Sequence, residues 1–245
     1  MSAIDIMPAS LARSALLAAA HAARRVTRGG KARGAQTPDA SASLSVSAAA
    51  DAPFDAVVIG ASAGGVDVLG QLLPMLPANF GAAVLIVLHL PPASPSFLVE
   101  ALADRCALPV SEPDAGEPIL RGRVYIAPPD YHLLVDSDAS IALSIEGPVR
   151  FSRPSIDVLM ESAAAVYGAR LLGVLLSGAN DDGARGLAAI RAAGGTAWAQ
   201  APETAYAPQM PEAAIAAGAV NETLTPTALG ARLAAWPRLL PASPG

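Results

Sequence analysis

The sequence contains a single cysteine, Cys106, which excludes an intrachain disulfide and any metal site built on several cysteines. Its three histidines, His21, His89 and His132, are too few and too scattered to predict a zinc site. No apolar run reaches the length of a membrane-spanning helix. We therefore expect a protein with no metal, no cofactor and no membrane insertion.

Aromatic residues are also scarce, at 4% of the 245 residues, whereas apolar residues make up 53% and alanine and glycine are abundant. Small residues let helices pack closely on a sheet, so this composition favours an α/β fold over an aromatic-rich sandwich. A chain of this length can bury a good core within one domain. The formal net charge of −5 gives no general attraction to nucleic acid or to an anionic membrane.

The first 50 residues differ from the rest. They carry six basic and two acidic groups, a net charge of +4, which leaves −9 on the remainder. Residues 10–26 could form a short helix, but residues 28–53 have no hydrophobic period and bury too little surface to offset their ordering entropy. We predict a disordered or partly helical extension over residues 1–52 and a folded domain over 53–240. A targeting peptide, a misassigned start and a basic docking arm are the alternatives.

From residue 54 onward, strand-like and helix-like segments alternate. Continuous apolar runs predict buried parallel strands at 54–60, 82–90 and 171–178, with shorter extended pieces at 108–113, 196–200 and 219–224. Helical spacing predicts helices at 66–77, 94–106 (with Ser94 or Ser96 as N-cap), 154–170, 184–195, 210–218 and 225–236. Residues 116–147 alternate with a period near two and read as a β-hairpin. The repeated units predict a doubly wound, three-layer α/β/α fold with a mostly parallel sheet.

The turn Gly60–Gly65, with Ser62 at its apex, joins the first strand to the first helix. It is either a phosphate cradle or the site of a nucleophilic serine. The first reading is weaker, because the turn lacks the G-x-G-x-x-G spacing, an acidic partner about 20 residues on and a G-K-[ST] pattern. The nucleophile-elbow pattern G-x-S-x-G is present over residues 60–64.

Polar side chains follow three of the predicted strands. Ser62 follows the first, His89 ends the second, and the acidic pair Asp181 and Asp182 follows the strand at 171–178. Carboxyl ends of parallel strands form one edge of a sheet, so a nucleophile, a base and an orienting carboxylate could meet there. Each has a plain alternative: a tolerated small residue, a half-buried histidine bonded to backbone, and a cap for the next helix. The order Ser–His–Asp disfavours an ordinary α/β-hydrolase, in which the histidine comes last.

Six stretches between about residues 56 and 221 form a recognisable set: VVIGASAGGVDVL, VLHLPP, GRVYIAPPDYHL, SRPSIDVLMES, GVLLSGANDDGARGL, and AWAQ with QMPEAAI. In this order they resemble the catalytic domain of the bacterial chemotaxis protein-glutamate methylesterase, CheB. The resemblance implies a Ser-His-Asp triad of Ser62, His89 and Asp182, which selects Asp182 over Asp181. It also implies hydrolysis of glutamate γ-methyl esters on the cytoplasmic region of methyl-accepting chemoreceptors, with glutamine deamidation as a related activity.

For the oxyanion, we expect the backbone N–H groups of Ala63 and Ala179 as donors, with Gly64 and Gly65 allowing close approach of the substrate. The implied setting is cytoplasmic, the implied partners are the chemoreceptor and a separate response regulator or signalling protein, and we expect a monomer.

The sequence departs from the family pattern in three places. Ala179 replaces a methionine in the G-M-G-x-D-G motif and leaves a roomier wall, Gln209 replaces a glycine, and no receiver domain is expected before the catalytic one. Two other functions therefore stay open: a hydrolase of the same fold acting on another ester, and a non-catalytic module in a signalling assembly.

Overall fold

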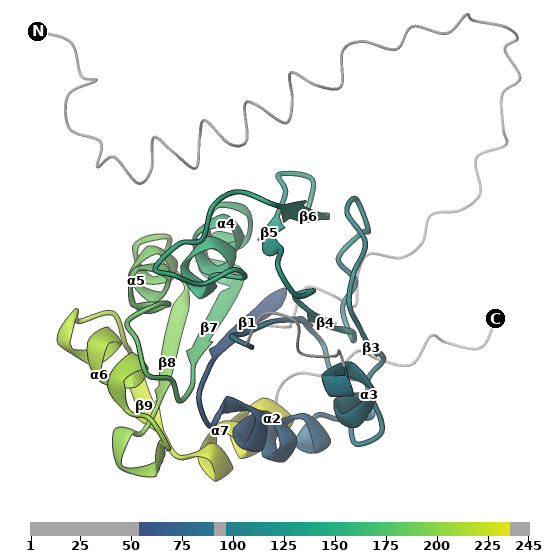
Figure 1. Ribbon diagram of the computed structural model, residues 1–245. Helices are drawn as coiled ribbons and strands as arrows, with labels where there is room; N and C mark the ends of the chain where they lie inside the picture. Colours follow the sequence, from purple (N-terminus) through teal and green to yellow (C-terminus); the bar gives the residue numbers. More distant parts are fainter. Residues whose placement is uncertain (1–53, 91–96, 236–245) are drawn as a thin grey trace, which may run out of the picture. The chain divides into compact units, whose positions relative to one another are not determined.

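The computed structural model describes residues 54–90 and 97–235 (Figure 1). The predicted extension over residues 1–52 and the predicted N-cap at Ser94 or Ser96 lie outside the described residues. The division into an extension and a domain over 53–240 stays a prediction.

A seven-stranded sheet forms the centre of the described chain, in the order β3-β4-β2-β1-β7-β8-β9, and every neighbouring pair is parallel. Its strands are β1 (Ala56–Ala61), β2 (Ala83–Leu88), β3 (Val110–Ser111), β4 (Val124–Ile126), β7 (Leu171–Leu175), β8 (Thr196–Gln200) and β9 (Glu222–Leu224). Every residue of β1, β2 and β7 is buried, as the continuous apolar runs predict for strands covered on both faces.

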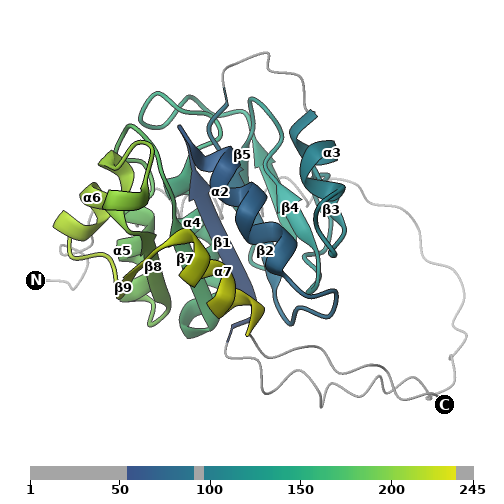
Figure 2. The ribbon, with the colours of Figure 1, turned by 90° about the horizontal axis from the view of Figure 1, so that it is seen from below.

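Helices cover both faces of the sheet. The α-helices are α2 (Gly65–Leu72), α3 (Phe97–Ala103), α4 (Ile156–Tyr167), α5 (Ala184–Ala192), α6 (Gln209–Ala216) and α7 (Pro226–Ala234). Buried side chains of α2, α3 and α7 share one apolar cluster with one face of β1, and those of α4, α5 and α6 share a second cluster with its other face. Figure 2 shows α2 and α7 in front of the sheet. The predicted doubly wound α/β fold is confirmed.

The strand order reverses beside β1. The chain continues from β1 to β2, then to the edge strand β3 and back to β4, which lies between β2 and β3. It later enters β7 on the other side of β1 before it reaches β8 and β9. In open α/β sheets, ligands bind outside the carboxyl ends of the strands at such a switch point. The loops after β1, β2 and β7 are therefore where a site is expected.

The β-hairpin prediction is correct for part of its range. The antiparallel pair β5 (His132–Val135) and β6 (Ile141–Ser144) forms a separate small sheet, and a turn over residues 136–139 joins the two strands. The segment Val124–Ile126 is instead β4 of the main sheet, parallel to β2. Its three residues are all buried, so the short apolar run belongs to the central core and not to a half-exposed hairpin.

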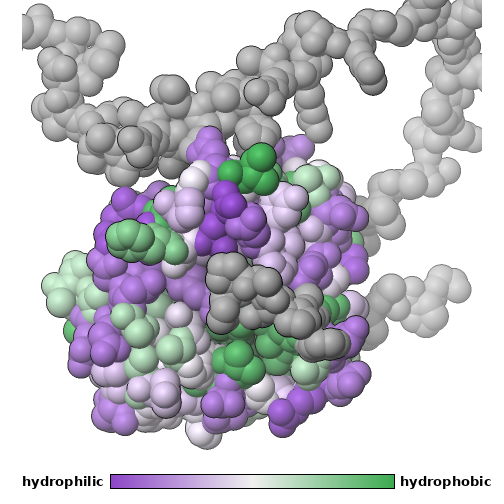
Figure 3. All heavy atoms as spheres, viewed as in Figure 1, coloured by the Kyte–Doolittle hydropathy of each residue, from purple (hydrophilic) through white to green (hydrophobic). Residues whose placement is uncertain are grey.

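Two helix ends also differ from the sequence pattern. The helix predicted over 66–77 ends at Leu72 and continues as a 3₁₀ turn, η2 (Leu73–Met75), because Pro74 has no N–H to continue the α-helical ladder. Helix α4 begins at Ile156 with Ser155 as N-cap, two residues after the predicted start at Pro154. No helix in the described part of the chain is long and apolar enough to cross a membrane. The face in Figure 3 is mostly hydrophilic, with separate hydrophobic patches.

Candidate active site

The serine turn leaves β1 at the centre of the sheet. The N–H of Ser62 donates to the carbonyl of Ser177 at 2.9 Å, and its carbonyl accepts from the N–H of Gly65 at 2.8 Å. Gly64, with φ of 78°, is the N-cap of α2. The turn is tightly enclosed, since a Cβ on Gly178 would lie 2.9 Å from the Cβ of Ser62. These contacts hold the backbone of Ser62 at the carboxyl edge of the sheet. Ser62 itself is half-buried.

The next strand brings His89 to the same edge. Ala61 pairs with Leu88 in the parallel register, so Ser62 and His89 occupy neighbouring positions just past the two strand ends. The N–H of His89 continues the ladder by donating to the carbonyl of Ala61 at 3.0 Å. No hydrogen bond joins Ser62 Oγ to the imidazole within the described residues, and such bonds are often long in ligand-free enzymes.

The ring of His89 contacts Asp182, the residue that the CheB resemblance selects from the acidic pair. His89 Nε2 lies 3.0 Å from Asp182 Oδ2, and the side chains are 11% and 0% exposed. With Nε2 engaged by the carboxylate, Nδ1 is the ring nitrogen that could meet a serine hydroxyl. In the trypsin-type triad it is Nδ1 that bonds to the carboxylate.

Asp181 points to a different partner. Its side chain is 55% exposed and forms an ion pair with Arg150, from the segment between β6 and α4. The structure therefore separates the roles of two adjacent carboxylates: one is buried against His89, and the other lies at the surface.

Asp182 does not cap the helix that follows it but the N-terminus of α4. Its Oδ1 accepts from the hydroxyl of Ser155 at 3.0 Å and from the N–H of Asp157 at 2.9 Å. Its Oδ2 accepts from the N–H of Ile156 at 2.8 Å, in addition to its contact with His89. Four donors thus surround the carboxylate and fix its orientation toward the histidine.

These donors determine the charge state of Asp182. Burial by itself raises the pKa of this carboxyl, but the hydrogen bonds from His89 and from the Asp157 and Ile156 amides outweigh burial. The net result is a pKa below the ordinary value of 3.8. The group is therefore an anion at neutral pH, as an orienting carboxylate must be.

Asp157, in turn, caps the N-terminus of α5. This fully buried residue sits in the first turn of α4, and its Oδ1 accepts from the N–H groups of Gly183 and Gly186 at 2.9 and 2.8 Å. Its Oδ2 accepts from Arg185 Nε at 2.9 Å and lies 3.4 Å from Arg150 Nε. Each of the two helices is thus capped by a carboxylate from beside the start of the other, and this reciprocal pair holds Asp182 in place.

Burial raises the pKa of Asp157, and the nearby Asp182 charge raises it further, while its backbone and Arg185 hydrogen bonds oppose the shift. The pKa values of the two neighbouring carboxyls therefore move in opposite directions. Asp182, with the histidine contact, holds its charge more firmly than Asp157 does.

We predict that Asp157→Ala lowers the free energy of unfolding by about 2–6 kcal/mol, because two buried amide donors lose their acceptor at about 1–3 kcal/mol each. The change leaves the N–H groups of Gly183 and Gly186 and the guanidinium of Arg185 without their acceptor. Denaturant unfolding of wild type and variant measures the difference.

Two further variants calibrate this result. Asp157→Asn keeps an oxygen for both glycine amides and should lose less stability than Asp157→Ala. Glu161→Gln removes only a 3.5 Å pair with the half-exposed Arg185, so it should cost less than about 1 kcal/mol. Equal stability of Asp157→Ala and wild type would contradict the reciprocal capping.

A second histidine lies behind Asp182. His132, 2% exposed at the start of β5, accepts from the N–H of Ser155 through Nδ1 at 3.1 Å and lies 3.2 Å from the Gly147 carbonyl through Nε2. Since Nδ1 accepts and Nε2 donates, the ring is neutral. Burial lowers the pKa of His132, and the positive charge of Arg153 lowers it further, against the opposing effect of the Gly147 hydrogen bond.

This histidine makes stability depend on pH. Because the pKa of His132 is lowered on folding, its contribution is present above the ordinary value of 6.5 and is lost as pH falls below it. We predict that the unfolding free energy decreases as the pH falls through 6.5, with a slope from this group of at most about 1.4 kcal/mol per pH unit.

The matched variant is His132→Asn, whose side-chain oxygen can accept near the position of Nδ1 but does not titrate. Its unfolding free energy should change less over the same pH range. A slope as steep as that of wild type would assign the pH dependence to other groups.

The two amides expected to serve the oxyanion have no acceptor among the described contacts. Within the described residues, the N–H groups of Ala63 and Ala179 donate to no other group, whereas the N–H of Ser62 is engaged by Ser177. Ala63 is half-buried and Ala179 is exposed. Both amides are thus available to an oxyanion, which is the role expected for them, and that role stays a prediction together with those of Gly64 and Gly65.

Ser177 and Gln200 also contact the serine turn and the strand ends beside it, and neither residue was predicted from the sequence. The buried hydroxyl of Ser177 donates to the carbonyl of Ala63 at 2.7 Å, and its N–H donates to Gln200 Oε1 at 3.0 Å. Polar residues at the ends of β7 and β8 were the available signal for both. For Asp157 and Ser155 the signal is their place at the start of a predicted helix, whereas nothing in the sequence distinguishes His132 from the other two histidines.

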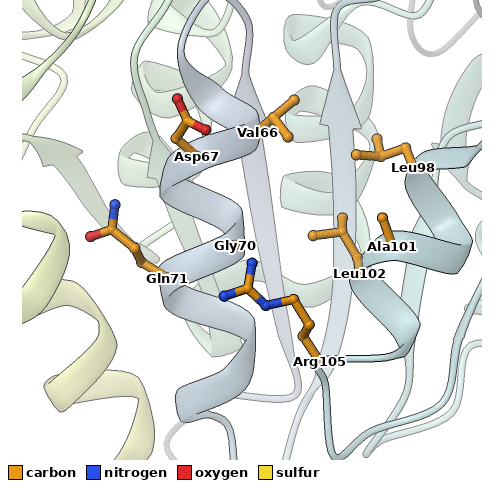
Figure 4. A pocket seen from close by; sticks show the side chains of 8 residues that line it. All are labelled: Val66, Asp67, Gly70, Gln71, Leu98, Ala101, Leu102 and Arg105. Carbon is orange, nitrogen blue, oxygen red and sulfur yellow. The ribbon is translucent and has the colours of Figure 1, made fainter.

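A hollow lies between α2 and α3, and Figure 4 shows Arg105 extending toward α2 near Gly70. None of the residues predicted for the site lines it. In the described part of the chain, no group of three or more His, Cys, Asp or Glu residues is arranged to hold a metal ion.

Comparison with known proteins relates this geometry to a family. The family model for the CheB methylesterase matches residues 57–233. The structure is similar to the crystal structure of the Thermotoga maritima CheB methylesterase catalytic domain, with a TM-score of 0.71 and 32% sequence identity, over 74% of this chain and 98% of that one.

Several curated relatives are more similar in sequence. A Leptospira interrogans protein, whose name pairs protein-glutamate methylesterase with protein-glutamine glutaminase, is 45% identical over 172 residues, which is 70% of this chain and 89% of that protein. A protein-glutamate methylesterase/protein-glutamine glutaminase of Symbiobacterium thermophilum is 42% identical over 172 residues, and one from Chromohalobacter salexigens is 40% identical over 180 residues.

The chain spans about half the length of these last two relatives, 48% and 51%, and 70% and 72% of it is covered. The match to the family model extends from β1 to α7 and so includes the whole described sheet with its serine turn, histidine and carboxylate. The chain belongs to the CheB methylesterase family, a family of carboxylic ester hydrolases.

Proposed function

We propose that this protein is a protein-glutamate methylesterase that hydrolyses glutamate γ-methyl esters on the cytoplasmic region of chemoreceptors to glutamate and methanol. The observation that carries the proposal is the 3.0 Å contact between His89 Nε2 and the buried Asp182 carboxylate, beside the strand end that bears Ser62. The family membership and the names of the relatives supply the substrate class.

In the acylation half, His89 Nδ1 accepts the proton of Ser62 as the hydroxyl oxygen attacks the ester carbonyl carbon. The Asp182 carboxylate stabilises the imidazolium that forms. The N–H groups of Ala63 and Ala179 donate to the oxyanion of the tetrahedral intermediate. When this intermediate collapses, the carbon–methoxy bond breaks, and His89 returns the proton so that methanol leaves.

In the deacylation half, His89 accepts a proton from water, and the resulting hydroxide attacks the ester that links the substrate to Ser62. The same oxyanion donors act again, and the serine recovers its proton as glutamate is released. With glutamine as substrate, the same steps release ammonia instead of methanol. This deamidation is a second candidate activity, favoured by the paired activity in the names of the relatives.

The deciding experiment measures methanol released by the purified full-length protein from a methyl-esterified chemoreceptor cytoplasmic fragment, with small acyl esters in parallel. Release well above the uncatalysed rate is expected. Rapid hydrolysis of small esters without methanol release would favour a hydrolase of another ester, for which the small Ala179 side chain leaves room. Folded protein that hydrolyses neither, and whose Ser62 resists a fluorophosphonate, would favour a non-catalytic module.

A further inference from the structure

Tyr206 lies beside the serine turn with most of its surface free. It belongs to the loop between the 3₁₀ turn η4 (Pro202–Thr204) and α6, and the residue is 84% exposed. A Cβ atom on Gly64 would lie 2.5 Å from the Cβ of Tyr206. The base of the tyrosine side chain, Cβ and Cγ, therefore lies against the turn two residues after Ser62, while most of the residue is left to solvent.

Hydrogen bonds join the loop that carries Tyr206 to the edge of the sheet that bears Ser62. The N–H of Ala207 donates to Ser177 Oγ at 2.9 Å, and its carbonyl accepts from the N–H of Gly178 at 2.9 Å. One turn later, the N–H of Met210 donates to the Gly178 carbonyl at 2.9 Å. The loop that carries Tyr206 is thus joined to the segment that packs on Ser62 and precedes Ala179.

Burial does not account for an aromatic residue at this position. A ring that is mostly exposed contributes little to the hydrophobic stabilisation of the fold. A rigidly supported tyrosine does, however, present a large contact area at a low cost in conformational entropy, and tyrosine is enriched among the residues that dominate binding interfaces.

The substrate chemistry needs such a contact. A glutamate methyl ester is small and uncharged, so it offers the enzyme little binding energy of its own. Interactions with the surrounding polypeptide must provide the affinity and position the ester on the serine.

We propose that Tyr206 is a substrate-contacting residue that packs its ring against an aliphatic side chain next to the methylated glutamate, and so favours polypeptide esters over small ones. This inference rests on the proposed function, since it deepens the recognition of the same substrate. The contact is apolar, so the phenyl ring rather than the hydroxyl carries it.

Binding to the catalytically silenced Ser62→Ala protein tests the contact apart from the chemistry. The probe is the methyl-esterified chemoreceptor cytoplasmic fragment. Adding Tyr206→Ala to Ser62→Ala should raise Kd about 5- to 30-fold, the range for loss of an interface anchor. Adding Tyr206→Phe should leave Kd within about twofold of the parent, because the ring remains.

Leu120→Ala is the matched control. This residue is 51% exposed, and its neighbour Arg121 pairs with Asp55, which precedes β1 at the opposite edge of the sheet. Kd should not change. In the active background, Tyr206→Ala should lower the ratio of methanol release from the fragment to hydrolysis of p-nitrophenyl acetate by a similar factor.

The inference is overturned if Tyr206→Ala binds the fragment as the parent does, if the parent does not bind it, or if Leu120→Ala weakens binding equally. A wild-type protein that binds the fragment through Tyr206 but releases no methanol contradicts the proposed function and leaves the contact intact. The two failures are thereby distinguished.

Discussion

Ser62→Ala should reduce the turnover for methanol release from methylated chemoreceptor on the order of 10⁶-fold, as for loss of the nucleophile in other serine hydrolases. Without Oγ no acyl intermediate can form. The amides of Ala63 and Ala179 remain and can still stabilise an oxyanion, so the variant should retain a residual rate above that of the uncatalysed reaction.

The variant should also stay folded, which makes the loss interpretable. Ser62 is half-buried, and the hydrogen bonds of its turn come from the backbone, which the substitution leaves intact. The control is Ser137→Ala, an exposed serine in the turn between β5 and β6. It should have wild-type turnover. Methanol release by Ser62→Ala at the wild-type rate would disprove the serine mechanism.

Asp182→Asn should reduce turnover about 10⁴-fold, the loss known for the equivalent change in a Ser-His-Asp triad. The carboxylate accepts from donors on both oxygens, so an asparagine must direct its NH₂ group at one of these pairs. If the NH₂ faces His89, Nε2 has to accept, and the ring proton moves to Nδ1. Nδ1 is then unable to take the proton of Ser62.

The alternative orientation has its own cost. With the amide oxygen toward His89, the NH₂ group opposes the N–H of Asp157 and the hydroxyl of Ser155. An unsatisfied buried donor of this kind costs about 1–3 kcal/mol, so thermal stability should fall as well. Turnover must therefore be expressed per folded molecule, using the unfolding curve of each variant.

Asp181→Asn is the matched control one residue away. That side chain is 55% exposed and pairs only with Arg150 among the described contacts, so its charge contributes less than about 1 kcal/mol. Turnover should change less than about threefold. A larger loss in Asp181→Asn than in Asp182→Asn would reverse the assignment of the acidic pair.

Several features of this protein were predictable because they depend on local patterns. Continuous apolar runs identified β1, β2 and β7, and the repeated strand–helix alternation implied a parallel sheet with helices on both faces. Since parallel strands end at one edge, the sequence alone predicts that Ser62 and His89 lie near each other.

Other features could not be predicted from the sequence, because they depend on contacts between segments that are distant along the chain. The sequence pattern admitted Asp182 as a cap of α5, yet it caps α4, and Asp157 caps α5 in exchange. The sequence does not show whether a carboxylate near a helix start caps that helix or a neighbouring one. Only the packing of α4 against α5 distinguishes these two possibilities. The assignment of Val124–Ile126 to the main sheet likewise depends on which strand it pairs with.

The division between the two kinds of information follows from physics. Hydrophobic period and strand ends are set by neighbours along the chain, so the fold and the edge that bears Ser62 could be derived from the sequence. The ring nitrogen that meets the carboxylate, and the support of the Tyr206 loop by Ser177 and Gly178, arise from hydrogen bonds between residues far apart in sequence. Their geometry depends on how the elements pack, which only the folded molecule specifies.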